Sequence, residues 1–300
     1  MLSQHQNQIK RSIPPQILNY AILGILVLLY APLVIFWYDG WLNKNISTEH
    51  EYFSHAMIGF PFAAYLVWMN RKKWVRLPDN TNILGGILLA IGGVFYLSGV
   101  SEWVNLSLPV ILTGLCLWLK GIKGFKLQGF PLLLVLLATP NSVPYLIAPF
   151  TLPLQSFIAG TAGFIVNQFG LDVVVDGINI YVNQRIVEVA PYCAGLKMLF
   201  TTIYVGLILL YWTDTLSSRR KSIWFLSIAV ILSVTANIIR NTLLTFFHGT
   251  GQDGAFHWLH DSWGGDLYSA CMLLVLIPAI NWIDSYFSEE PVDNSDSEIQ

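Results

Sequence analysis

The feature that most constrains this chain is a series of long apolar segments separated by short polar loops. A helix needs roughly 20 apolar residues to cross a bilayer core that is about 30 Å thick. Such segments fill most of the 300 residues, of which only 11% are charged, and the mean hydropathy is +0.57. An ordinary soluble domain carries about 25% charged residues. The sequence therefore predicts an all-α polytopic membrane protein and excludes an ordinary soluble enzyme or a disordered chain.

About eight transmembrane helices are expected. They fall at residues 17–38, 52–70, 82–100, 104–120, 126–140, 194–213, 222–246 and 266–286. The apolar segment 145–169 has prolines in and before it, and because proline interrupts a helix we interpret it as an interfacial or re-entrant element. Residues 1–287 are expected to form a single membrane domain, and residues 288–300 an acidic, disordered cytoplasmic tail.

The basic residues orient this arrangement, because cytoplasmic loops of membrane proteins are enriched in Lys and Arg. With the N-terminus in the cytoplasm, 12 of the 16 basic residues face inward, only Lys44 and Arg185 face outward, and Lys197 and Arg240 fall inside spans. The inward set is Lys10, Arg11, Arg71, Lys72, Lys73, Arg76, Lys120, Lys123, Lys126, Arg219, Arg220 and Lys221. We therefore expect an inner (plasma) membrane protein with both termini in the cytoplasm.

The two longest outer segments are residues 170–193 and 247–265. The first alternates apolar and polar residues around Asp176-Gly177, a pattern that predicts a small extracytoplasmic β-element before the helix that follows Cys193. The second is rich in glycine and is expected to be a flexible loop. Five of the six histidines lie at or beyond the outer boundary: His50, His55, His248, His257 and His260. Functional groups therefore gather at the outer face.

Three residue types at this face suggest acyl transfer. Cys193 lies where an extended segment turns into a helix, and the positive end of a helix dipole favours the thiolate. Arg240 lies inside a predicted span, where an arginine costs about 2.5–3.5 kcal/mol and is usually functional or paired. His260 could shuttle a proton. Cys193 alone could equally be a small buried residue, and Arg240 could extend toward the lipid headgroups.

Neighbouring residues could support such a site. Asn237 lies one helical turn before Arg240 and could orient its guanidinium group. Lys197 lies one turn after Cys193 and could stabilise the thiolate or extend toward the headgroups. His257 competes with His260 for the acid–base role.

Two alternatives stay open from the residues alone. His257, His260, Asp261 and Asp266, with or without His55, could bind zinc as a metallopeptidase, but no HExxH motif or Cys/His ligand spacing accompanies them. A transporter is the second alternative, but its ionisable residues would be expected near the membrane midplane. The net charge of −2 gives no reason to expect a nucleic-acid partner. No cofactor or bound metal is expected for the cysteine mechanism.

Several motifs, taken in order, resemble the exosortase/archaeosortase family, and most closely its cyanobacterial branch, the cyanoexosortases, with the B type as the nearest. The resemblance covers about residues 50–285. The motifs are Ser54-His55-Ala56, the basic stretch after Trp68, Phe130-Pro131, Thr139-Pro140, Pro153-Leu-Gln155, Glu188 to Gly195 around Cys193, Asn237-Ile-Ile-Arg240, and His260 to Gly264. Two positions depart from the family pattern: Ala194 stands where Ser is commoner, and Ala56 where Gly is.

The resemblance implies a thiol peptidase or transpeptidase with Cys193 as nucleophile, Arg240 as stabiliser of the oxyanion or thiolate, and His260 as general acid–base. Gly264 favours His260 over His257 in this comparison. Asn237, Glu188, His55 and Lys197 would support the site. The implied substrates are exported proteins with a C-terminal sorting signal, made of a Pro-Glu-Pro-like motif, a transmembrane helix and a basic tail. Membrane lipid is the other expected partner.

Overall fold

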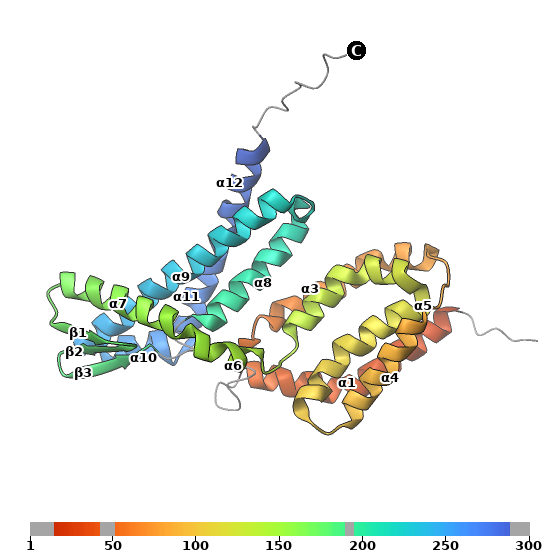
Figure 1. Ribbon diagram of the computed structural model, residues 1–300, viewed down its shortest axis with the longest axis horizontal. Helices are drawn as coiled ribbons and strands as arrows, with labels where there is room; N and C mark the ends of the chain where they lie inside the picture. The colour runs from red at the N-terminus through yellow and green to blue at the C-terminus, as the bar shows by residue number, and fades with distance from the viewer. Residues whose placement is uncertain (1–14, 43–51, 190–194, 289–300) are drawn as a thin grey trace, which may run out of the picture.

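The computed structural model describes residues 15–42, 52–189 and 195–288, and it is helical through most of them (Figure 1). Cys193 and most of the predicted acidic tail lie outside the described residues. The elements are α1 (Pro15–Leu42), α3 (Ala56–Arg76), α4 (Ile83–Leu97), α5 (Ser101–Ala138), α6 (Val143–Ile147), η1 (Ala148–Thr151), α7 (Leu152–Gln168), β1 (Val173–Asp176), β2 (Asn179–Val182), β3 (Arg185–Glu188), α8 (Leu196–Trp212), η2 (Thr215–Ser217), α9 (Arg219–Gly249), α10 (Asp253–His260), α11 (Trp263–Leu274) and α12 (Leu276–Ser288).

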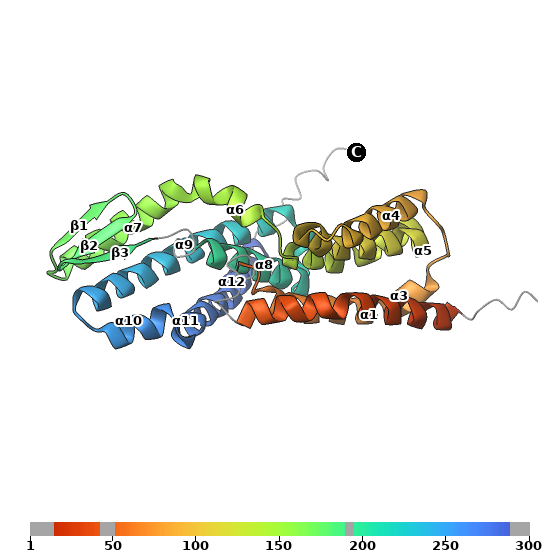
Figure 2. The same ribbon diagram turned by 90° about the horizontal axis from the view of Figure 1, so that it is seen from below.

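The N-terminal helices α1, α3, α4 and α5 form one group (Figures 1 and 2). Within α5 the chain breaks sharply at Gly121, which has a φ of 61° and a ψ of −155°. A Cβ at this position would lie 2.7 Å from the carbonyl oxygen of Asn80, so only glycine fits both the backbone angle and the close approach. The predicted spans 104–120 and 126–140 are the two arms of this one broken helix.

Buried polar pairs hold α1 against α5. The indole N–H of Trp37 donates to Asn105 Oδ1 over 2.9 Å, and the hydroxyls of Tyr30 and Ser107 lie 2.8 Å apart. All four side chains are buried. Because an unpaired polar group would be costly in an apolar interior, these pairs fix where α1 sits along α5.

Helix α8 joins the N-terminal group to the C-terminal one. The Tyr204 hydroxyl donates to the carbonyl of Leu134 over 3.0 Å, and the Tyr211 ring stacks on Phe130 with centroids 4.0 Å apart. Its other side packs with α9 and α12 around Leu210, Phe225 and other buried apolar residues. The middle and the end of α8 are therefore packed on both sides.

A three-stranded antiparallel sheet in the order β1-β2-β3 lies at the site of the predicted hairpin. Its registers pair Asp176 with Asn179 and Val182 with Arg185. Two glycines let helices approach it: a Cβ at Gly163 of α7 or at Gly249 of α9 would lie 2.4 Å from a valine methyl of the sheet. The sheet therefore rests on α7 and the end of α9.

The segment 145–169 is divided among α6, η1 and α7, and its interpretation as an interfacial or re-entrant element stays a prediction. Pro153 lies in the first turn of α7, and Pro149 in the first turn of η1. Proline is tolerated there because the amide groups of a first turn have no partner within the helix. Residues 149–168 are apolar and long enough to cross a membrane.

The segment 247–265 is not a flexible loop in the structure. Residues 253–260 form α10, whose Leu259 is only 3% exposed. The glycines in this segment suggested a loop, but a short helix can form where one of its side chains is anchored in the core. His257 and His260 are therefore held on a helix.

Five helical segments in the described ranges are long and apolar enough to span a bilayer: 21–41, 101–138, 149–168, 219–249 and 263–287. Helices α4 and α8 are apolar but shorter. The chain thus has the helices of a multi-pass membrane protein. The count of eight spans, which treats the two arms of α5 separately and includes α3, α4 and α8, stays a prediction.

Candidate active site

Helix α9 presents Asn237 and Arg240 one turn apart. The helix begins after Ser218, whose hydroxyl accepts a hydrogen bond from the Lys221 amide. Residues three apart lie on the same helical face, and here Asn237 is buried while Arg240 is half-buried. The Tyr268 hydroxyl of α11 donates to the carbonyl of Ala236 over 2.6 Å. This bond fixes α11 against α9 at the level of the two polar residues.

The Asn237 side chain lies against Gly195, the residue immediately before α8. Gly195 has a φ of 80°, in the left-handed region, and a Cβ there would lie 2.8 Å from Asn237 Cγ. Both the backbone angle and the lack of space require glycine. The end of the segment that carries Cys193 is therefore packed one helical turn from Arg240.

Arg240 also lies beside the junction of α10 and α11. A Cβ at Gly265 would be 3.5 Å from the Nη2 atom of Arg240 and 2.8 Å from the carbonyl oxygen of Leu259. Leu259 is next to His260 in sequence. Elements around residues 195, 240 and 260 thus meet in one region, although they are far apart along the chain.

Three polar atoms in this region have no hydrogen-bond partner among the described residues. They are the Oδ1 and Nδ2 atoms of Asn237 and the Nε atom of Arg240, all buried. Leaving a buried donor or acceptor unpaired costs about 1–3 kcal/mol, so these atoms are candidates to bind water or another group. The suggested hydrogen bond between Asn237 and Arg240 is not among the contacts of the described residues.

The two histidines of α10 share one carboxylate. The Nδ1 atom of His257 lies 2.7 Å from Asp261 Oδ2, and the Nδ1 atom of His260 lies 2.5 Å from Asp261 Oδ1. An ionised carboxylate only accepts hydrogen bonds, so each Nδ1 carries the proton. These bonds, the one from His257 first and the one from His260 second, hold the pKa of the Asp261 carboxyl below its usual value.

The surroundings distinguish the two histidines. The side chain of His257 is 68% exposed and that of His260 is 30% exposed. The His260 ring stacks on Phe256, with centroids 5.2 Å apart and planes 9° apart. Between Phe256 and Asp261, the His260 ring has a fixed plane and a fixed tautomer, as a proton-transferring imidazole requires.

The sheet is tied to this region by exposed contacts. Arg185 Nη1 at the start of β3 lies 2.5 Å from Asp253 Oδ1 at the start of α10, and this ion pair holds the pKa of Asp253 below its usual value. Asn183 donates to the carbonyl of Gly249 over 2.9 Å. Because β3 leads into the cysteine segment, these contacts link that segment to the helix that carries the histidines.

The remaining predicted site residues are more scattered. Glu188 ends β3 and is exposed, since its neighbours Val187 and Val189 face the core. Lys197 lies in the first turn of α8 and is half-buried. Both residues belong to the described part of the chain. Cys193 itself lies outside it.

His55 has structural contacts. It is 4% exposed, its Nε2 atom lies 3.2 Å from the carbonyl oxygen of Leu137, and its ring centroid is 4.5 Å from that of Tyr204. These contacts are with α5 and α8, and Tyr52 and Phe53 beside it pack on Leu196 at the start of α8. His55 therefore packs behind the start of α8, where it can stabilise the position of that helix.

The zinc alternative finds no matching geometry in residues 15–42, 52–189 and 195–288. No group of three His, Cys, Asp or Glu side chains in these ranges is arranged to hold a metal ion. His257 and His260 both turn Nδ1 toward Asp261, so these nitrogens bind the carboxylate instead of a common metal.

Asp261 is the residue whose position the sequence reasoning missed, since it entered only as a possible zinc ligand. The spacing of His257 and Asp261, four apart, places both on one face of a helix. This signal becomes visible only when residues 253–260 are recognised as helical.

One comparison with known proteins gave a match. The model of the family described as transmembrane exosortase (Exosortase_EpsH) matches residues 41–277. The searches of curated proteins and of solved structures gave no match. The matched range contains Cys193 and every element of the region described above.

Proposed function

Because the chain belongs to the transmembrane exosortase family, we propose that it is a cysteine endopeptidase or transpeptidase that cleaves the C-terminal sorting signals of exported proteins. The substrate would present a Pro-Glu-Pro-like motif at the outer face of the inner membrane, followed by its own transmembrane helix and basic tail. Within the family, the resemblance of its motifs taken together is greatest to the cyanobacterial branch.

The observation that carries this proposal is the packing of Gly195 on Asn237. Two peptide links separate Gly195 from Cys193, and consecutive Cα atoms are about 3.8 Å apart, so the Cα atom of Cys193 is within about 8 Å of that of Gly195. Arg240 is one turn from Asn237. This packing supports the proposal, because it brings the end of the segment that carries Cys193 to within one helical turn of Arg240.

The proposed reaction has two steps. The Cys193 thiolate attacks the scissile carbonyl, the C–N bond breaks, and the leaving amine takes a proton from His260. The exported protein is then attached to Cys193 as a thioester. Water or an acceptor amine attacks this thioester, gives a proton to His260 and releases the thiolate.

Arg240 and Asp261 have different roles in this scheme. The Arg240 guanidinium group stabilises the thiolate before attack and the oxyanion during it. The Nε atom of Arg240, buried and unpaired among the described residues, is a donor available for such an anion. Asp261 holds the proton on Nδ1 of His260, so proton transfer takes place at Nε2.

The scheme includes a membrane orientation. The basic residues at the ends of α3 and α9 lie in the cytoplasm, and the sheet and α10 lie at the outer face. The cleavage site of an exported substrate would then reach the catalytic residues from outside, while its basic tail stays in the cytoplasm.

A processing assay tests the proposal. A tagged sorting-signal substrate is co-expressed with the full chain, and Cys193→Ala, Arg240→Gln and His260→Gln are compared one at a time. Each should leave the substrate uncut while the enzyme remains in the membrane fraction at the wild-type level. An alkylating thiol reagent should trap wild-type protein in inactive form, and a chelator should have no effect.

Matched variants keep the test specific. Cys271→Ala removes an exposed free cysteine of α11, and Arg219→Gln removes an exposed arginine at the start of α9; both should process substrate normally. Normal processing by Cys193→Ala would refute the cysteine mechanism. Inhibition by chelator alone would favour the metallopeptidase alternative.

A further inference from the structure

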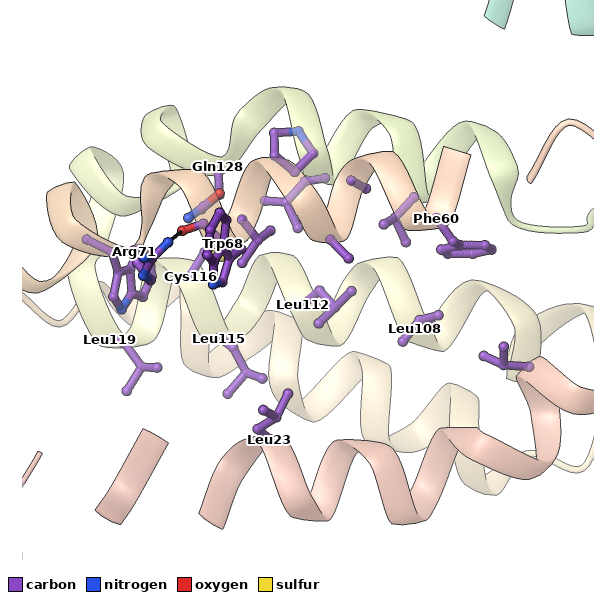
Figure 3. Close-up of a pocket in the computed structure, with 18 residues that line it drawn as sticks. Leu23, Phe60, Trp68, Arg71, Leu108, Leu112, Leu115, Cys116, Leu119 and Gln128 are labelled. Atoms are coloured by element: carbon purple, nitrogen blue, oxygen red, sulfur yellow. Dashed lines mark hydrogen bonds between the residues drawn. The ribbon is translucent and has the colours of Figure 1, made fainter. Parts of the chain in front are cut away.

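An elongated apolar cavity of about 620 Å³ lies between α1, α3 and α5, away from the proposed catalytic residues (Figure 3). Its inner wall includes Ala63, Leu108 and Val135, which are at most 8% exposed. Leu23 and Trp68 also line it and are exposed, by 57% and 56%. The cavity is thus open toward the side where lipid would lie. Its volume is within the range of about 300–1,000 Å³ that is usual for small-molecule sites.

The two ends of the cavity differ in polarity. Phe60 and Leu108 line one end, and Arg71 and Gln128 lie at the other (Figure 3). Among the described residues that line the cavity, Arg71 is the only charged one. Its guanidinium carbon lies 3.8 Å from the centre of the Trp68 ring, and Nη1 donates to the Trp68 carbonyl over 2.9 Å. A guanidinium group has five N–H donors, so this bond leaves most of them for another acceptor.

The charges around Arg71 favour an anion. Within the described residues near this end, the basic side chains are Lys72, Lys73 and Arg76 of α3 and Lys120, Lys123 and Lys126 of α5. The one acidic side chain there, Asp79, is already bound to Lys120, with Nζ and Oδ1 2.6 Å apart. An anionic headgroup would be stabilised here, whereas the basic tail of a sorting signal would be repelled.

The length of the cavity fits one leaflet. Leu108 and Leu119 line it on α5, and Phe60 and Arg71 line it on α3. Each pair is eleven residues apart, which at a rise of 1.5 Å per residue is roughly 16 Å. Half of a bilayer core of about 30 Å is about 15 Å. A single chain that starts at the basic end would reach the middle of the membrane at the other end.

We propose that this cavity binds one acyl chain of an anionic phospholipid, with the phosphate group beside Arg71. The lipid would fill the space between α1, α3 and the two arms of α5, and would fix α1 to the rest of the membrane domain. The bound lipid would take no part in catalysis, and it is distinct from the peptide substrate of the proposed function.

Native mass spectrometry of the purified full chain tests this proposal. The protein, in mild detergent, is mixed with equal amounts of phosphatidylglycerol and phosphatidylcholine that have the same acyl chains. We expect one phosphatidylglycerol to be retained in preference. Arg71→Gln should lower its retention about fivefold, as expected for a basic residue that contributes about 1 kcal/mol. Arg71→Lys should keep the preference, and Arg219→Gln, which removes a charge outside the cavity, should not change it.

A second pair of variants tests whether the acyl chain occupies the apolar part of the cavity. Ala64 lines the cavity from an exposed position, so Ala64→Trp should fill it and abolish lipid retention without disturbing the core. Ala90→Trp adds the same side chain at an exposed position of α4 outside the cavity and should retain lipid normally.

Three results would overturn the proposal. Equal retention of the two lipids by the wild type would mean that only non-specific lipid binds. Unchanged retention in Ala64→Trp would place the lipid elsewhere. Loss of substrate cleavage in Ala64→Trp with normal lipid retention would assign the cavity to the apolar segment of the substrate.

Discussion

Gly195 and Asn237 are in contact so close that a methyl group on Gly195 would lie 2.8 Å from Asn237 Cγ. Gly195 precedes α8, and Asn237 is in the middle of α9. The contact therefore fixes the end of the segment that contains Cys193 relative to α9 and Arg240. Any side chain larger than hydrogen at position 195 must therefore move Gly195 and Asn237 relative to each other.

Gly195→Ala should lower both stability and activity. A non-glycine residue in the left-handed region costs about 1–2 kcal/mol, and the contact with Asn237 adds to it. We expect a clear fall in the melting temperature and at least a tenfold loss of processing (~1.4 kcal/mol). Gly93→Ala is the matched control, because nothing lies within 4 Å of its Cβ position in α4. Wild-type processing by Gly195→Ala would contradict the role of this contact.

Replacement of the two histidines one at a time should separate their roles. His260→Gln should reduce the rate about 10²–10⁴-fold, the usual contribution of a general acid–base. His257→Gln should cost less than tenfold, because the His257 side chain is 68% exposed, against 30% for His260. The measurement is the initial rate of substrate cleavage. If His257→Gln lowers the cleavage rate more than His260→Gln does, His257 is the general acid–base and His260 is not.

Asp261→Asn should change the dependence of stability on pH. The hydrogen bonds from His257 and His260 lower the pKa of Asp261 in the folded state below the ordinary value of an aspartate. A group with a lowered folded pKa stabilises the protein above its unfolded pKa, and this stabilisation is lost as the pH falls through the folded pKa. The difference in melting temperature between wild type and Asp261→Asn should therefore be present at pH 5 and should shrink below about pH 4.

Asp261→Asn should also slow catalysis, because the asparagine amide does not hold the proton on His260 Nδ1 as the carboxylate does. We expect a fall in the maximal rate with little change in substrate affinity, and Asp261→Glu should restore part of the rate. Asp172→Asn removes an exposed carboxylate before β1, away from the two histidines, and is the control. Equal rates for Asp261→Asn and wild type would exclude a positioning role.

The sequence was sufficient for the features that depend on local composition. The apolar segments predicted a mostly helical, multi-pass membrane protein, which the family and five long apolar helices support. The three-residue spacing of Asn237 and Arg240 predicted that both lie on one face of a helix, here α9. The alternation around Asp176 indicated the hairpin, which the structure contains as β1 and β2. Its position outside the membrane stays a prediction.

Features that depend on packing between distant segments could not be predicted in this way. The glycines near α10 suggested a loop, but burial of Leu259 stabilises a helix there. The prolines near α7 suggested a break, but each lies in a first turn, where it is tolerated. The contact of Gly195 with Asn237 and the shared carboxylate of Asp261 require the positions of α8, α9 and α10 in space, and no local pattern contains these positions.

Gly264→Ala tests whether the junction of α10 and α11 holds His260 in place. A Cβ on Gly264 would lie 2.6 Å from the carbonyl oxygen of Trp258, and this backbone atom cannot move without shifting α10. Such overpacking usually costs about 1–3 kcal/mol. The shift would move His260 relative to Arg240, so we expect at least a tenfold loss of processing (~1.4 kcal/mol). Gly254→Ala in α10, where nothing lies within 4 Å of the added methyl group, should remain active. If both variants process substrate equally well, the close packing of Gly264 does not determine the position of His260.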